Sequence, residues 1–310
     1  MPNWRTILGE INQDQALHAA ASRSAQDTIR RKYLAKLHQH TGRNVIAYYS
    51  GWLSKPDVAQ SEITDEDKNG FMMAVHGLDR TKGLDLFIHT PGGSIAATES
   101  IVDYLQQMFA NDIRAIVPQI AMSAGTMMAC SCRSILMATH SNLGPIDPQL
   151  RGIPAHGVVQ EFKRAYREIK NEPRKIEVWR PILSQYRPTF LSQCENAIKW
   201  SDAFVETQLK SVMFAGDSQA TKKARKIVKH LTDYRGNRTH NRHISRDECE
   251  NVGLEIEKIE SDPTLQDLIL TVHHCYMHAL MNTTSFKMIE NHTGAALVKK
   301  IKQQVVAVPS

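Results

Sequence analysis

The sequence contains few of the residues that hold small or fibrous proteins together without a core. Only 5 of its 310 residues are cysteines, and an odd number cannot pair completely within one chain. We therefore expect reduced thiols and a cytoplasmic location rather than a disulfide framework. With 16 glycines and 12 prolines, the chain is neither collagen-like nor of low complexity. Hydrophobic residues at 42% and charged residues at 23% predict a globular protein of one large or two small domains.

Long hydrophobic segments are also missing from the chain. No apolar run follows the first charge near the N-terminus, so no signal peptide is expected. Residues 115–132 carry no charge, but they include Pro118, Gln119 and Gly125. A membrane-spanning helix needs about 20 mostly apolar residues. We therefore expect this segment to be buried core, with no membrane insertion.

Motifs for cofactors and metals are absent from the sequence. There is no Walker A motif and no G-x-G-x-x-G, so any ATP-driven unfolding of a substrate would need a separate ATPase partner. His274 and His278 have the spacing of two zinc ligands on a helix, but Cys275 occupies the position of the glutamate in H-E-x-x-H. Cys130 and Cys132 lack a second cysteine pair. We expect neither a cofactor nor a metal.

Positive charge is concentrated in one part of the chain. The net charge is +6, and residues 220–246 contain nine Lys and Arg residues against a single acid, Asp233. Such a cluster can bind nucleic acid or an acidic partner. A solvated helix and loop is the simpler interpretation, and nucleic-acid binding remains the alternative.

Alternation of expected strands and helices in the middle of the chain predicts α/β organisation. The apolar and β-branched segments 44–49, 84–89, 113–120 and 133–138 indicate strands. Amphipathic segments between them complete βαβ units and therefore a mostly parallel sheet. Further helices are expected at 15–38, 65–78, 155–212 (interrupted at Pro173, Pro181 and Pro188), 245–254 and 263–280. The last thirty residues show no clear pattern.

Two loops follow expected strands, at the sheet edge where α/β proteins bind ligands. In Thr90-Pro91-Gly92-Gly93, two glycines before a helix leave backbone N–H groups exposed, as donors for an anion or oxyanion. In Met122-Ser123-Ala124-Gly125, small residues surround Ser123 at a strand-to-helix turn. If the parent strands are neighbours, the loops supply a nucleophile and an oxyanion hole for acyl transfer. Alternatively, Ser123 is only a small residue in a tight turn.

Three motifs in order resemble the serine dehydrogenase proteinase family. They are His89-Thr90-Pro91-Gly92-Gly93, Ala121-Met122-Ser123-Ala124-Gly125-Thr126 and Ser141-Asn142-Leu143-Gly144-Pro145-Ile146-Asp147-Pro148-Gln149. The family is similar to signal peptide peptidase A, within the Clp protease/crotonase superfamily. The resemblance implies an α/β fold with a repeated ββα spiral and a serine endopeptidase whose nucleophile is Ser123. It also implies oxyanion donors at Gly92-Gly93 and Ala124.

The general base is not specified by the resemblance. Clp-type peptidases use a histidine and signal peptide peptidases a lysine, but no histidine stands at the position expected from Clp, near Asp147. A lysine must be buried to become neutral at pH 7, whereas a histidine needs no such shift. We therefore rank His240 first and Lys175 second, followed by His156, with Lys163 also within plausible reach.

The expected organisation is an N-terminal helical extension (1–40), a catalytic domain (41–260, with a helical insertion at about 155–212) and a C-terminal helical segment (261–310). The resemblance implies a polypeptide substrate and a homo-oligomer. The missing histidine leaves a second hypothesis open, a catalytically silent scaffold or regulatory module.

Overall fold

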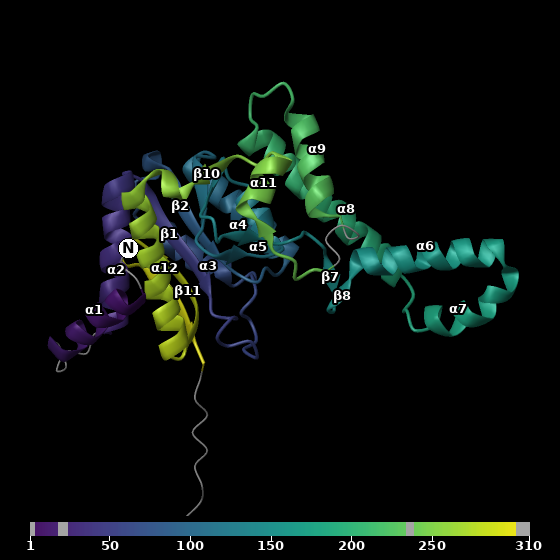
Figure 1. The fold of residues 1–310 in the computed structure, drawn as a ribbon, viewed down its shortest axis with the longest axis horizontal. Coiled ribbons are helices and arrows are strands. Elements are labelled where there is room, and N and C mark those ends of the chain that lie inside the picture. The colour runs from purple at the N-terminus through teal and green to yellow at the C-terminus, as the bar shows by residue number, and fades with distance from the viewer. Residues whose placement is uncertain (1–3, 18–23, 234–238, 302–310) are drawn as a thin grey trace, which may run out of the picture.

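The computed structural model of the protein describes residues 4–17, 24–233 and 239–301. It is built on a seven-stranded sheet with the order β10-β5-β3-β2-β1-β11-β12 (Figure 1). Five neighbouring strands are parallel: β1 (Asn44–Ser50), β2 (Leu84–His89), β3 (Ile113–Val117), β5 (Ser134–Met137) and β10 (Ile256–Lys258). The last two, β11 (Ser285–Asn291) and β12 (Ala296–Lys300), pair antiparallel. The α/β fold with a mostly parallel sheet is thus confirmed.

Helices cover both faces of the sheet, which is why every residue of β1 and β2 is buried. One core contains α3 (Asp67–Val75), α4 (Ile95–Phe109), α5 (Ala124–Cys130), part of α8 (Phe190–Gln208), α9 (Ala220–Leu231) and α11 (Arg246–Val252). The other core contains α1 (Trp4–Leu17), α2 (Ala25–Thr41) and α12 (Pro263–Asn282). Successive β1 residues alternate between the two cores, with Tyr48 in the first and Tyr49 in the second.

A second, small sheet lies where the parallel strands end. Its strands are β4 (Ile120–Ala121), β6 (Asn142–Leu143) and β9 (Ile244–Ser245). Two isolated bridges extend the pairing, one between Thr90 and Ala121 and one between Ile63 and Gly93. From β2, β3 and β5 the chain therefore continues into this second layer of pairing before the next helix begins.

The predicted helical insertion forms an arm that projects from the sheet (Figure 1). It consists of the hairpin β7 (Gln149–Leu150) and β8 (Ile153–Pro154), then α6 (Ala155–Asn171), the 3₁₀ turn η2 (Pro173–Lys175), α7 (Ile176–Leu183) and α8. The helices are interrupted near Pro173 and Pro188, as expected, but Pro181 lies inside α7. A small core that includes Val158 and Cys194 joins α6 to α8.

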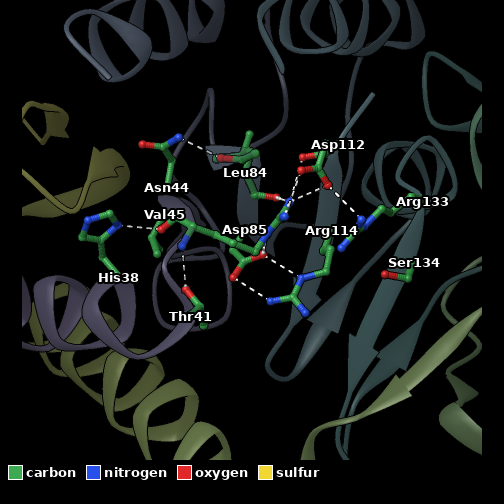
Figure 2. A network of polar contacts seen from close by, with 12 residues as sticks. His38, Thr41, Asn44, Val45, Leu84, Asp85, Asp112, Arg114, Arg133 and Ser134 are labelled. Carbon is green, nitrogen blue, oxygen red and sulfur yellow. Dashed lines mark hydrogen bonds and ion pairs between the residues drawn. The ribbon is translucent and has the colours of Figure 1, made fainter. Parts of the chain in front are cut away.

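Charged side chains link the first parallel strands at their amino ends, opposite the small sheet (Figure 2). The fully buried Asp85 of β2 accepts hydrogen bonds from Arg43, before β1, and from Arg114 of β3. Arg43 also contacts Asp112, which pairs with Arg133. The network connects three adjacent strands.

The ends of the chain differ from the expected helical segments. The pattern over 15–38 corresponds to the end of α1 and most of α2, with residues 18–23 outside the described part. After α12, the chain adds β11 and β12 to the main sheet rather than more helix. The segment 261–310 is therefore not wholly helical, because the apolar residues of β11 are buried between the two cores. No helix in the described ranges is both long and apolar enough to span a membrane.

Candidate active site

The two loops singled out from the sequence lie side by side. Their parent strands β2 and β3 are adjacent and parallel, so both loops emerge at the same sheet edge. The bridge between Thr90 and Ala121 holds them together, with the Met122 N–H donating to the Thr90 carbonyl at 3.0 Å. Neighbouring strand ends thus bring Gly92, Gly93 and Ser123 to one place.

Ser123 occupies a turn that few residues other than glycine adopt. Its φ is +50° and its ψ is −113°, a conformation that costs free energy and is maintained by the surrounding packing. Although Ser123 stands at the N-cap of α5, its hydroxyl makes no capping bond. The next turn packs closely, since a Cβ on Gly125 would lie 2.5 Å from Thr90 Cγ2. The packing therefore fixes the position of Ser123, while its hydroxyl does not cap the N-terminus of α5.

The glycine pair is required by close backbone approach. Gly92 has φ +100°, and a Cβ there would lie 2.8 Å from both Ser123 Cβ and the Met122 carbonyl oxygen. A Cβ on Gly93, with φ +153°, would lie 2.3 Å from the Ile63 nitrogen. The bridge to Ile63 uses the Gly92 carbonyl and the Ser94 N–H, at 2.7 and 3.0 Å. In this pattern the Gly93 N–H points away from Ile63.

A cleft with a volume of about 670 Å³ contains the nucleophile candidate, one oxyanion donor candidate and one base candidate. Ser123, Gly93 and His240 all line it. Most of the remaining lining is apolar, including Met127 and Trp200, and Glu62 supplies a carboxylate. The lining residues come from the loops after β2 and β3, from the arm and from the segment before α11.

His240 reaches the cleft from the loop that precedes β9. Among the residues that the structure describes, its buried Nδ1 has no hydrogen-bond partner, and burial lowers the pKa of its imidazole. A lowered pKa keeps the ring neutral at pH 7, as a general base requires. No hydrogen bond links His240 to Ser123 among the described residues, and apo sites often have such looser geometry.

The structure does not bring the other base candidates to this cleft. Lys175 lies on the arm with its side chain 42% exposed, and its Nζ is 3.8 Å from carboxylate oxygens of both Glu168 and Glu172. Lys163 lines a different cavity, between α6 and α8. His156, in the first turn of α6, has a pKa lowered by burial but does not line the cleft.

Two features of the site were not predicted from the sequence. The first is the segment around Ile63, which forms one wall of the cleft. Its only signal in the sequence is a single apolar residue among polar neighbours, and the structure shows that this residue is fully buried. The second is Asp147, which is 4% exposed and lies between the cleft residues Ile146 and Pro148. Burial raises the pKa of the Asp147 carboxyl to about 6. Its motif was recognised, but its burial was not foreseen.

The histidines considered as zinc ligands have structural contacts. The His278 ring packs against the Trp4 ring in a tilted arrangement with centroids 3.7 Å apart, and its Nε2 lies 3.1 Å from the Trp4 carbonyl oxygen. Across the described ranges, no three His, Cys, Asp or Glu side chains are grouped as a metal ion would require.

Comparison with known proteins adds independent information. Two uncharacterized proteins of Methanocaldococcus jannaschii are similar: MJ0137 is 32% identical over 195 residues, and MJ1495 is 28% identical over 194. Each match covers 63% of this chain, which spans about 60% of the length of either relative. ATP-dependent Clp protease proteolytic subunit 2 of Thermobifida fusca is 33% identical over 73 residues, 23% of this chain and 36% of that protein.

Among solved structures, an alanine mutant of the 1510-N membrane-bound stomatin-specific protease is similar over 63% of this chain and 74% of its own, with 18% identity and a TM-score of 0.36. The family described as ClpP-like SDH-type serine proteinase matches residues 18–290. That range includes both loops of the cleft and all of its lining residues, and it extends beyond the expected catalytic domain at each end. The chain therefore belongs to the ClpP-like SDH-type serine proteinases, as the sequence motifs predicted.

Proposed function

We propose that this protein is a serine endopeptidase that acts through an acyl-enzyme on Ser123. The observation that carries the proposal is the convergence of Ser123, Gly93 and His240 on one cleft. Membership of a serine proteinase family supports the reaction class. The strained backbone of Ser123 supports its selection as the nucleophile, because strain of this kind accumulates at functional sites.

Each step of the reaction has a group to perform it. Ser123 Oγ attacks the carbonyl carbon of a peptide while His240 accepts the hydroxyl proton. The oxyanion receives hydrogen bonds from the N–H groups of Gly93 and Ala124, with Gly92 allowing the loop to approach. The intermediate then expels the amine, which takes the proton from His240, and water hydrolyses the acyl-enzyme by the same steps in reverse.

His240 is preferred over Lys175 as the base for two reasons. It lines the cleft, whereas Lys175 lies on the arm between two carboxylates. Carboxylates close to an ammonium group favour its charged form, which cannot accept a proton. The buried Nδ1 of His240 has no partner in the described part of the chain, so a tautomer with the proton on either nitrogen is open to it.

The test is labelling with a serine-directed fluorophosphonate, together with cleavage of an unfolded polypeptide. Wild-type protein is expected to be labelled on Ser123, and Ser123→Ala to lose both labelling and cleavage. His240→Gln is expected to slow labelling by about 10²- to 10⁴-fold, while Lys175→Gln serves as the control and labels at the wild-type rate. Absence of labelling in every assembled form would instead favour the catalytically silent scaffold.

We also propose a polypeptide substrate, self-association and a cytoplasmic location. Self-association is supported by large apolar side chains exposed on the arm, including Tyr166, Val178 and Ile182. A separate ATPase partner is proposed for any ATP-driven unfolding of the substrate, because the sequence contains no Walker A motif.

Nucleic-acid binding by segment 220–246 is the alternative proposal for this basic part of the chain. In α9, Lys223 pairs with Asp217 and Arg225 with Glu206, so part of the positive charge is compensated. Residues 234–238 of the segment lie outside the described part of the chain.

A further inference from the structure

A buried polar network lies behind the candidate oxyanion loop. At its centre is Asp67, the first residue of α3, with a fully buried carboxylate. Lys287 of β11, only 1% exposed, donates to both Asp67 oxygens at 3.0 and 2.8 Å. Tyr48 of β1 donates its hydroxyl to Asp67 Oδ2 at 2.9 Å. Three elements far apart in sequence thus meet at one carboxylate.

The network extends to the segment that pairs with Gly93. Asp67 Oδ2 accepts the N–H of Thr64 at 3.0 Å, and Lys287 Nζ donates to the carbonyl of Glu62. These two residues flank Ile63, whose N–H and carbonyl hold Gly92 and Ser94. Both sides of the candidate oxyanion loop are therefore tied to the same ion pair.

We propose that Lys287, Asp67 and Tyr48 are positioning residues that set the direction of the Gly93 N–H toward the oxyanion. The inference rests on the proposed peptidase function. A buried ion pair contributes little net stability over a well-packed apolar group, because desolvation offsets the attraction. The role of the ion pair here is to orient the Gly93 amide, because it holds the backbone on both sides of that amide. Neither the reacting serine nor the base contacts the network among the described hydrogen bonds.

The chain itself provides a matched pair of variants. Tyr48 and Tyr49 are consecutive in β1, both fully buried, and each makes one side-chain hydrogen bond through its hydroxyl to a buried residue, Tyr48 to Asp67 and Tyr49 to His273 at 3.3 Å. They differ in which face of the sheet they occupy. Tyr48→Phe and Tyr49→Phe therefore remove similar groups with similar structural cost, but only the first lies on the path to the oxyanion loop.

The experiment measures fluorophosphonate inactivation of the full chain, with the maximal rate (kinact) and the half-saturating concentration (KI) separated, alongside thermal unfolding. Removing an oxyanion donor costs about 10²- to 10³-fold in rate, so misdirecting one is expected to lower kinact by about 10-fold in Tyr48→Phe. KI is expected to stay unchanged, and Tyr49→Phe to keep the wild-type kinact.

Equal kinact values for Tyr48→Phe and Tyr49→Phe, whether both normal or both reduced in step with their unfolding temperatures, would overturn the positioning role. That result is separate from failure of the proposed function. If wild-type protein is labelled at Ser123 and Ser123→Ala is not, the peptidase proposal survives and only the network inference fails. If Ser123→Ala is labelled like the wild type, the peptidase proposal fails with it.

Discussion

Replacing Gly92 by alanine tests whether the loop must touch the serine turn. The added Cβ would lie 2.8 Å from Ser123 Cβ and from the Met122 oxygen, and 3.1 Å from the Ala124 nitrogen. Two of these neighbours are backbone atoms, which cannot rotate away as a flexible side chain could. The loop and the serine turn must therefore separate, and both candidate oxyanion donors move with them.

Two free-energy costs contribute to the loss of stability in Gly92→Ala. A control substitution at a second glycine separates them. A left-handed φ costs an L-residue about 1–2 kcal/mol, and overpacking a well-packed site costs about 1–3 kcal/mol more. Gly253 ends α11 with φ +112°, and a Cβ there would meet no described atom within 4 Å apart from its own neighbours along the chain. Gly253→Ala is therefore expected to lose about 1–2 kcal/mol of unfolding free energy, and Gly92→Ala about 2–5 kcal/mol.

The assay is fluorophosphonate labelling of Ser123 at a temperature where denaturant unfolding shows both variants folded. A displacement of about 1 Å at a reacting centre can cost about 10²-fold in rate. Gly92→Ala is thus expected to be labelled at least about 100-fold more slowly than the wild type, and Gly253→Ala at the wild-type rate. A folded Gly92→Ala protein with normal labelling would refute the argument that this contact defines the site.

Three further outcomes are expected. Asp85→Asn should lower the free energy of unfolding by about 3–5 kcal/mol, because it leaves Arg43 and Arg114 facing a neutral group, yet labelling of the folded protein should be normal. Asp147 has a raised pKa, so its contribution to stability is full at low pH and is lost as pH rises through about 6. Asp147→Asn should therefore be more stable than wild type above pH 7, by about 3 kcal/mol in urea unfolding, and not at pH 4. The labelling rate should increase with pH through a pKa below the usual 6.5 of histidine, because burial lowers the pKa of His240. A further increase in the labelling rate above pH 8 would instead indicate another base.

Local sequence patterns were sufficient for the elements that carry the nucleophile and the oxyanion loop. The strand at 84–89, the Ser94 N-cap of α4 and the turn at Gly253 were predicted from apolar runs, capping residues and glycine. The approach of the two loops then follows from one further fact, the adjacency of β2 and β3. Short-range rules work here because each signal and its consequence lie within a few residues.

The remainder of the site depends on contacts that no local pattern contains. Ile63 reaches Gly93 from a polar stretch, and its partners are visible only when α3 and β11 are in place. Lys175 was a reasonable base candidate by position along the chain, but the direction of the arm is set by packing between α6 and α8. Whether a basic residue faces Ser123 is thus a property of tertiary structure.

The amino and carboxyl ends of the parallel strands differ in what their residues do. The residues at one end stabilise the sheet, and those at the other end form the candidate site. At the amino ends, Asp85 joins three strands through fully made ion pairs, an arrangement that resists displacement and leaves no reactive group free. At the carboxyl ends, Ser123 and Gly92 adopt left-handed backbone and the serine hydroxyl has no capping role. Such a strained turn persists only if the rest of the sheet over-determines it. The stability lost in Asp85→Asn and the rate lost in Gly92→Ala should therefore be nearly independent, and the double variant should show the sum of the two single effects in each measurement.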